Sequence, residues 1–148
     1  MPASGISLVD LNVWLALAFD GHVHHPTALN WFKRGAANTA GFCRITQLGL
    51  LRLLTNRSVM GPFVLTQRGA WEGYERLCRD ERVVFLEEPM DLEKHWRQLT
   101  PQDSTDHKTW TDAYLAGFAI SGQIPLVTFD RGFCEFKGLQ LDLLEACK

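Results

Sequence analysis

Two short, uncharged runs of this chain have the composition of buried strands, and each is followed by an aspartate. Ile6–Val9 directly precedes Asp10, and Ile124–Thr128 precedes Asp130 with only Phe129 between them. Runs of this kind are typical of parallel sheets, because helices cover both faces and exclude water from the strands. Ligands of such sheets bind beyond the carboxyl ends of the strands, so both aspartates are expected at that edge.

Helical patterns alternate with strand patterns along the chain, which favours an α/β fold with a largely parallel sheet. With 148 residues, the chain is expected to be one domain that is long enough to bury a substantial core. Residues 56–62 are expected to form a loop. Helices are predicted over 11–19, 26–34, 46–55, 66–78, 91–99 and 107–121, and further strands over 39–43, 82–86 and 139–143.

Asp112 is a third isolated carboxylate, and it lies in a predicted helix of apolar and small residues. No other charged residue occurs from Thr109 to Phe129. A helix that is apolar nearly all round is a core helix, so Trp110 and Tyr114 are expected to be buried in it. Because a buried carboxylate is costly without a partner, Asp112 is the aspartate that a purely structural role explains least well.

Together the three aspartates predict a site for a hard divalent cation. Mg²⁺ and Mn²⁺ prefer carboxylate oxygens, and three such groups at one edge of a sheet would suit either ion. Such a site points to phosphoryl chemistry on a nucleic acid or a nucleotide. The competing interpretation of Asp10 and Asp130 is structural, because an aspartate after a strand often caps a helix or forms a turn.

The overall charge of the chain neither requires nor excludes a nucleic-acid partner. The formal net charge is -2, but a local basic rim is sufficient to bind phosphates. Arg44 and Arg131 are the best-placed phosphate contacts, because one follows a predicted strand and the other follows Asp130. The four cysteines form no CxxC pair, and no stretch approaches the ~20 apolar residues of a membrane span. A cytoplasmic protein without a membrane segment is therefore expected.

Three stretches of the chain match a known family in their order and spacing. They are Ile6–Leu15, Asp112–Ala116 and Val127–Phe133, and they resemble the corresponding motifs of PIN-domain ribonucleases of the VapC toxin type. Residues 46–56 are similar to the subgroup that is abundant in mycobacteria. The resemblance extends over residues 1–148 as a single PIN domain. It implies a three-layer sandwich, in which helices cover both faces of a mainly parallel central sheet.

This family consists of metal-dependent endoribonucleases, so the resemblance also implies an activity. It implies that Asp10, Asp112 and Asp130 are catalytic residues that hold Mg²⁺ or Mn²⁺, and that Asn12 and Thr128 support them by hydrogen bonding. It further implies a homodimer, a VapB-type antitoxin as partner, and an RNA substrate. Cleavage of structured RNA, such as transfer or ribosomal RNA, would make the protein a toxin that inhibits translation and growth.

One position departs from the family pattern. Most members have a glutamate where this chain has Gln47, which offers a carbonyl oxygen as a supporting group but brings no charge. The alternative interpretation is therefore a degenerate PIN domain that binds RNA or a protein partner without cleaving. A phosphatase of the haloacid-dehalogenase type is disfavoured, because Asn12 stands where that class needs a second aspartate. Neither a GxGxxG nor a GK[ST] motif is present to indicate a nucleotide-binding fold.

Overall fold

The chain folds around a five-stranded sheet in the computed structural model, which describes residues 5–34 and 39–145. All neighbouring strands run parallel, in the order β3-β2-β1-β4-β5. The chain therefore turns to one side of β1 for β2 and β3, and to the other side for β4 and β5. The junction of β1 and β4 is the switch point where ligands of such sheets bind. The strands are β1 (Ile6–Val9), β2 (Thr39–Phe42), β3 (Val83–Phe85), β4 (Leu126–Thr128) and β5 (Leu141–Leu143).

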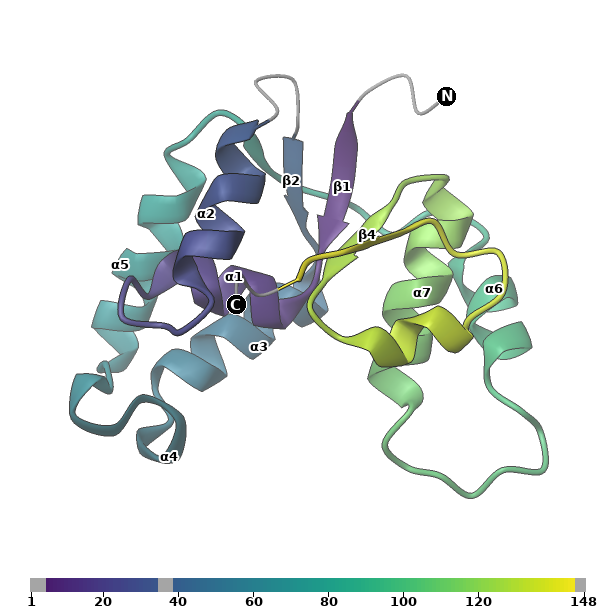
Figure 1. The fold of residues 1–148 in the computed structure, drawn as a ribbon. Helices are drawn as coiled ribbons and strands as arrows, with labels where there is room; N and C mark the ends of the chain where they lie inside the picture. The colour runs from purple at the N-terminus through teal and green to yellow at the C-terminus, as the bar shows by residue number, and fades with distance from the viewer. Residues whose placement is uncertain (1–4, 35–38, 146–148) are drawn as a thin grey trace.

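Helices cover both faces of the sheet, which confirms the expected three layers (Figure 1). One face carries α1 (Leu11–Ala18), α2 (His25–Arg34), α3 (Arg44–Leu54) and α5 (Gln67–Cys78), and the other carries α6 (Leu92–Leu99) and α7 (Trp110–Gly122). Shorter segments are α4 (Arg57–Met60) and the 3-10 turns η1 (Gly61–Phe63) and η2 (Arg131–Glu135). Among the described residues, no helix is both long and apolar enough to cross a membrane.

The central strands are uncharged because both of their faces are buried. Leu8 and Leu126 pack into the core beneath α6 and α7, whereas Val9 and Val127 pack into the core beneath α1, α2 and α3. Successive side chains of a strand point to opposite faces, so adjacent residues enter different cores. Two separate hydrophobic cores thus hold β1 and β4 in register from both sides.

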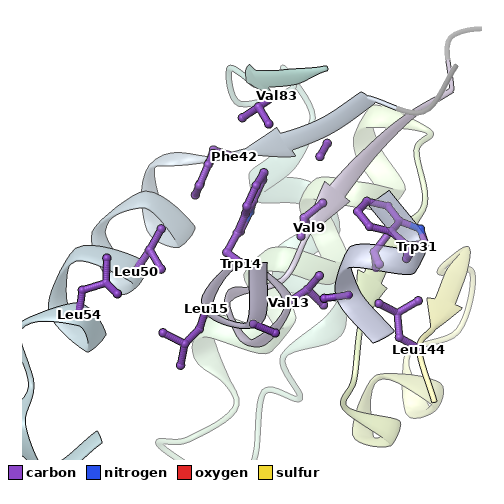
Figure 2. Close-up of a cluster of buried hydrophobic side chains, with 14 of the residues drawn as sticks. Val9, Val13, Trp14, Leu15, Trp31, Phe42, Leu50, Leu54, Val83 and Leu144 are labelled. Atoms are coloured by element: carbon purple, nitrogen blue, oxygen red, sulfur yellow. The ribbon is translucent and has the colours of Figure 1, made fainter. Parts of the chain in front are cut away.

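Aromatic stacking anchors α1 to the neighbouring strand. Trp14 of α1 and Phe42 of β2 are both fully buried, and their rings stack with centroids 3.6 Å apart (Figure 2). Leu50 of α3 packs into the same core. Because α1 begins directly after Asp10, this packing also fixes where the carboxyl end of β1 meets the helix.

The packing of α6 against α7 depends on a glycine. A Cβ atom added at Gly117 would lie 3.0 Å from the backbone nitrogen of Trp96, closer than nearly all real Cβ contacts. Only glycine allows the two helix backbones to approach this closely without displacement. This contact fixes the position of α7, and with it the position of Asp112.

The start of α7 differs from the sequence prediction. The helix begins at Trp110 rather than at residue 107, because the preceding segment forms its own turns. In one of these turns, the Oδ1 atom of Asp106 accepts a hydrogen bond from the backbone N–H of Lys108 at 2.8 Å. Asp112 therefore lies in the first turn of α7, where the helix is open to solvent.

The loop predicted over residues 56–62 was also wrong in part, because it contains α4 and the first residues of η1. The side chain of Asn56 caps α4 by accepting a hydrogen bond from the backbone N–H of Ser58 at 2.9 Å. Asparagine is a favoured N-cap, and one turn of helix is too short to show an apolar period.

Candidate active site

Asp10 is buried at the carboxyl end of β1, and both of its oxygens accept hydrogen bonds. Its Oδ1 atom caps α1 by accepting from the N–H of Leu11 at 2.7 Å, and its Oδ2 atom accepts from the hydroxyl of Thr128 at 2.7 Å. Burial raises the pKa of Asp10 above its ordinary value despite these bonds, and the charge of Asp130 adds to the effect. Asp10 therefore does cap a helix, as the structural interpretation expected. Its Oδ2 atom, however, belongs to a hydrogen-bond network that includes Thr128.

Thr128 connects the residues of this network. The hydroxyl is fully buried at the end of β4 and donates its only hydrogen to Asp10. It accepts from the backbone N–H of Asp130 at 3.0 Å and from the Nδ2 amide of Asn12 at 3.4 Å. A hydroxyl has one donor and two acceptor positions, so Thr128 uses all of its hydrogen-bonding capacity here. The structure therefore brings Asn12 and Thr128 into direct contact with the acidic residues.

Asp130 follows β4 by two residues and shapes the turn that leaves the sheet. Its Oδ1 atom accepts from the backbone N–H of Gly132 at 2.8 Å, which caps η2. The amide oxygen of Asn12 accepts from the N–H of Phe129 at 3.4 Å and braces the same turn against α1. The side chain of Asp130 is exposed, in contrast to that of Asp10.

Asp112 approaches the other two aspartates from α7 and is half-buried. Burial, together with the negative charges of Asp10 and Asp130, raises the pKa of Asp112 to about 6. The charge of Asp130 acts on Asp10 in the same way. Three carboxylates that are distant in sequence therefore form one electrostatic site, in which the charges of Asp10 and Asp130 disfavour ionisation of Asp112.

The carboxylates do not form a finished coordination sphere by themselves. Within residues 5–34 and 39–145, no group of three or more His, Cys, Asp or Glu side chains is arranged so that it could hold a metal ion as it stands. The donor chemistry nevertheless fits a hard cation, because all three groups are carboxylates and their mutual repulsion favours a nearby positive charge.

Gln47 and Arg44 form a separate polar group at the start of α3. Gln47 is buried, and its side-chain carbonyl accepts a hydrogen bond from the Nη1 atom of Arg44. The guanidinium of Arg44 also lies over the ring of Phe85, 4.6 Å from its centroid. In the part of the chain that the structure describes, Gln47 interacts with Arg44 and Tyr74 and is hydrogen-bonded to none of the three aspartates.

Arg131 lies next to Asp130 but reaches towards the last strand. Its Nη2 atom is 3.6 Å from the Oε1 atom of Glu145, and both side chains are more than two-thirds exposed, at 78% and 73%. An ion pair of this length and exposure contributes little to stability. The guanidinium is therefore accessible from solvent beside the candidate site.

An aromatic pocket at the start of α7 was not predicted from the sequence. Trp110 was expected to be buried, but it is 56% exposed, because it is the first residue of α7 and extends beyond the layer that covers the sheet. Tyr114 is buried as predicted and donates a hydrogen bond from its hydroxyl to Glu88 at 2.7 Å. The sequence offered no clear signal for this exposure, because the helix was predicted to begin at residue 107 and Trp110 then belongs to its apolar pattern.

The three aspartates lie within a stretch, residues 7–139, that matches the PIN domain family. This protein belongs to that family. It is 46% identical over 142 residues to Ribonuclease VapC41 of Mycobacterium tuberculosis, a match that covers 93% of this chain and 97% of the relative. It is 30% identical over 135 residues to Ribonuclease VapC38 of the same organism, with 86% of each chain covered. These relatives confirm the VapC-type resemblance of the sequence.

Solved structures of VapC proteins have the same fold. VapBC2 from Rickettsia felis, solved bound to a DNA fragment from the promoter, matches with a TM-score of 0.68 at 13% identity over 95% of this chain and 99% of that chain. VapC20 of Mycobacterium tuberculosis, described as a Sarcin-Ricin loop cleaving toxin, matches with a TM-score of 0.62 at 19% identity over 91% of this chain and 98% of that chain. At these identities the likeness shows the fold alone.

The raised pKa of Asp112, caused by burial and by the neighbouring carboxylates, predicts that Asp112→Asn stabilises the metal-free protein at neutral pH. The Asp112 pKa is about 6 in the folded chain and 3.8 as its ordinary value, so its charge costs stability above about pH 6. The cost disappears as the pH falls from about 6 to about 4, because the folded state then binds the proton first. We expect a gain of roughly 1 kcal/mol near pH 7.5, discounted because the carboxyl is half-exposed.

Urea unfolding of both proteins in EDTA, repeated at several pH values, measures this effect. The advantage of Asp112→Asn should shrink towards low pH. An equal stability of the two proteins at every pH would show that neither burial nor the neighbouring carboxylates raise the pKa of Asp112.

Proposed function

We propose that this protein is a divalent-metal-dependent endoribonuclease and the toxin of a VapBC toxin–antitoxin pair. The observation that carries the proposal is the shared electrostatic site of Asp10, Asp112 and Asp130 beside the switch point of the sheet. Mutually repelling carboxylates at such an edge are stabilised by a divalent cation. Relatives that carry the name ribonuclease over most of their length support RNA as the substrate.

The proposed cofactor is Mg²⁺, for which Mn²⁺ can substitute. We assign Asp10 and Asp112 as ligands, and Asp130 either as a ligand or as the residue that orients the attacking water. Mg²⁺ usually keeps several waters, so carboxylates that do not meet around one point can still bind it through those waters. The bound ion would lower the pKa of a water and offset the charge of the phosphate.

The chain's own residues orient this acidic site. Both oxygens of Asp10 accept a hydrogen bond, so the plane of its carboxylate is fixed before any ligand arrives. Thr128 fixes one of these oxygens, and Asn12 holds both Thr128 and the turn before Asp130. Loss of a residue that orients a metal ligand in this way typically weakens metal affinity by roughly 10- to 100-fold.

Two arginines are the proposed contacts for the phosphates of RNA. Arg44 is held by Gln47 and Phe85, so its guanidinium is already ordered for a two-point contact with a phosphate. The weak, exposed pair of Arg131 with Glu145 can be exchanged for a phosphate at small cost. In this assignment Gln47 supports an arginine rather than a metal ion.

The proposed protein partner is a VapB-type antitoxin. The structural neighbour from Rickettsia felis is named as a VapBC pair, and its fold covers 95% of this chain, which supports an antitoxin that binds the same fold here. We also infer a homodimer that acts in the cytoplasm. Its substrate would be a structured RNA such as transfer or ribosomal RNA, and cleavage of that RNA would stop translation and growth.

A degenerate PIN domain that binds RNA without cleaving it remains the second candidate function. One observation favours it: Gln47 is neutral and is engaged by Arg44, so it adds no negative charge to the site. The two functions differ in their dependence on metal, because a binding module need not bind Mn²⁺ at all.

Asp10→Asn should abolish cleavage and leave the fold intact. Asparagine is as good an N-cap as aspartate and can still accept from Leu11, but it removes one of the three charges. We expect wild-type protein to cut total bacterial RNA with Mn²⁺ or Mg²⁺ and not with EDTA, and Mn²⁺ to raise its melting temperature. The variant should show neither effect.

Asp20→Asn is the matched control, because Asp20 is exposed beyond the end of α1. It should behave as the wild-type protein does. Undiminished cleavage by Asp10→Asn would contradict the assignment of the site, and wild-type protein that neither binds Mn²⁺ nor cuts RNA would favour the binding module.

Thr128→Val should weaken Mn²⁺ binding by roughly 10- to 100-fold while preserving the shape of the buried side chain. Valine fills the same space but cannot donate to Asp10, so the carboxylate is no longer held. Thr128→Ser restores the hydroxyl and should restore most of the affinity. Calorimetric titration with Mn²⁺ measures both, and equal affinities for the valine and serine variants would exclude an orienting role for the hydroxyl.

A further inference from the structure

A pocket of about 350 Å³ lies between the start of α3 and the start of α7. Two of its lining residues, Trp110 and Thr111, belong to the same first turn of α7 as Asp112. The pocket adjoins the proposed phosphate contact, because Arg44 forms part of its wall. The residues of its wall that carry the argument are Arg44, Glu88, Trp96, Trp110, Thr111 and Tyr114.

The aromatic wall of the pocket is built rigidly. The Trp96 ring packs edge-to-face against Tyr114 at a centroid distance of 5.3 Å and against Trp110 at 6.3 Å. The Nε1 atom of Trp96 donates to the backbone oxygen of Trp110 at 3.1 Å, and Tyr114 is fixed by its hydrogen bond to Glu88. These contacts hold Trp110 in place although it is 56% exposed. A fixed, exposed indole on the helical turn that also carries Asp112 is a surface on which a planar ligand can stack.

The two charged residues of the pocket, Arg44 and Glu88, suit different parts of a nucleotide. Arg44 is a fixed cation that can bind a phosphate, whereas the carboxylate of Glu88 repels phosphate and accepts N–H groups. One Glu88 oxygen already accepts from Tyr114, so the carboxylate is oriented. A nucleobase between these two groups would place its backbone near Arg44 and its polar edge near Glu88.

We infer that this pocket binds an unpaired nucleobase next to the phosphate that is cut, with Trp110 as the stacking residue. The inference rests on the proposed nuclease function and adds a positioning element to it. Stacking on an aromatic side chain requires a base that is free of its helix, so the pocket selects single-stranded or looped RNA at the cleavage site. Glu88 would favour bases that present an N–H group to it.

The test is binding of fluorescently labelled RNA decamers in EDTA, measured by anisotropy for wild-type protein and for Trp110→Ala. The probes are oligo(A) and a decamer of abasic ribose phosphates. We expect Trp110→Ala to weaken oligo(A) binding by roughly 5- to 150-fold, the effect of one lost stacking contact. The abasic decamer should bind both proteins equally, because it has no base to stack. Trp110→Phe keeps an aromatic face and should retain most of the affinity.

Trp71→Ala is the matched control. Trp71 is also a half-exposed tryptophan, at 49%, and its ring also packs edge-to-face against a tyrosine, at 6.1 Å from Tyr74, but it lies on α5 outside the pocket. This variant should bind oligo(A) as the wild-type protein does. Equal losses in the two alanine variants, or no loss in either, would overturn the inference. So would a Trp110→Ala protein that binds RNA normally but binds its VapB-type antitoxin more weakly, because the pocket would then belong to a protein ligand.

If Trp110→Ala does not fold, a second variant that fills the pocket with a larger side chain tests the same inference. Ile45 lines the pocket and is 38% exposed, so Ile45→Trp would occupy the space of the base. It should weaken oligo(A) binding and leave abasic binding unchanged, and normal oligo(A) binding would overturn the inference.

Cleavage of total RNA by wild-type protein with Mn²⁺ tests the nuclease function separately. If the wild-type protein cleaves RNA but Trp110→Ala does not change oligo(A) binding, only the proposed base-binding role of the pocket is rejected. If Trp110→Ala weakens oligo(A) binding but the wild-type protein does not cleave RNA, only the proposed nuclease function is rejected.

Discussion

The parallel pairing of β1 with β4 is the constraint on which the candidate site depends. Leu8 pairs with Leu126 and Val9 with Val127, so the residues that follow, Asp10 and Thr128, meet at the carboxyl edge. A slip of one residue would turn Thr128 to the opposite face and break its bond to Asp10. The register is held by the two hydrophobic cores and not by the polar residues themselves. The geometry of the site is therefore determined by the packing of apolar side chains on both faces of the sheet.

The negative charges of the aspartates at the carboxyl edge of the sheet destabilise the metal-free fold. Burial and like charges raise the pKa of Asp112 and of Asp10, which means that the metal-free protein would be more stable without these charges. Unfavourable charge at one place in an otherwise well-packed chain is typical of a functional site, where stability is given up for binding.

Much of this arrangement follows from the sequence, because the strands are uncharged and end in aspartate. The parallel sheet and the sheet-edge positions of Asp10 and Asp130 could be predicted from that pattern alone. The hydrogen bonds between Asp10, Thr128 and Asn12 could not, since they join residues far apart in the chain, and only the family resemblance suggested them. The exposure of Trp110 depends on where α7 begins, and local turns before the helix decide that position. The bond of Tyr114 to Glu88 likewise depends on how α7 packs, and no periodicity in the sequence reports it.

The central claim is that Asp10, Asp112 and Asp130 form the site of the catalytic metal at the switch point of the sheet. The most direct measurement is the anomalous scattering of Mn²⁺ in crystals of the wild-type protein grown with the metal. The account predicts a Mn²⁺ peak between Asp10, Asp112 and Asp130, within direct or water-mediated reach of each. A peak at another place, or none at saturating Mn²⁺, would contradict it.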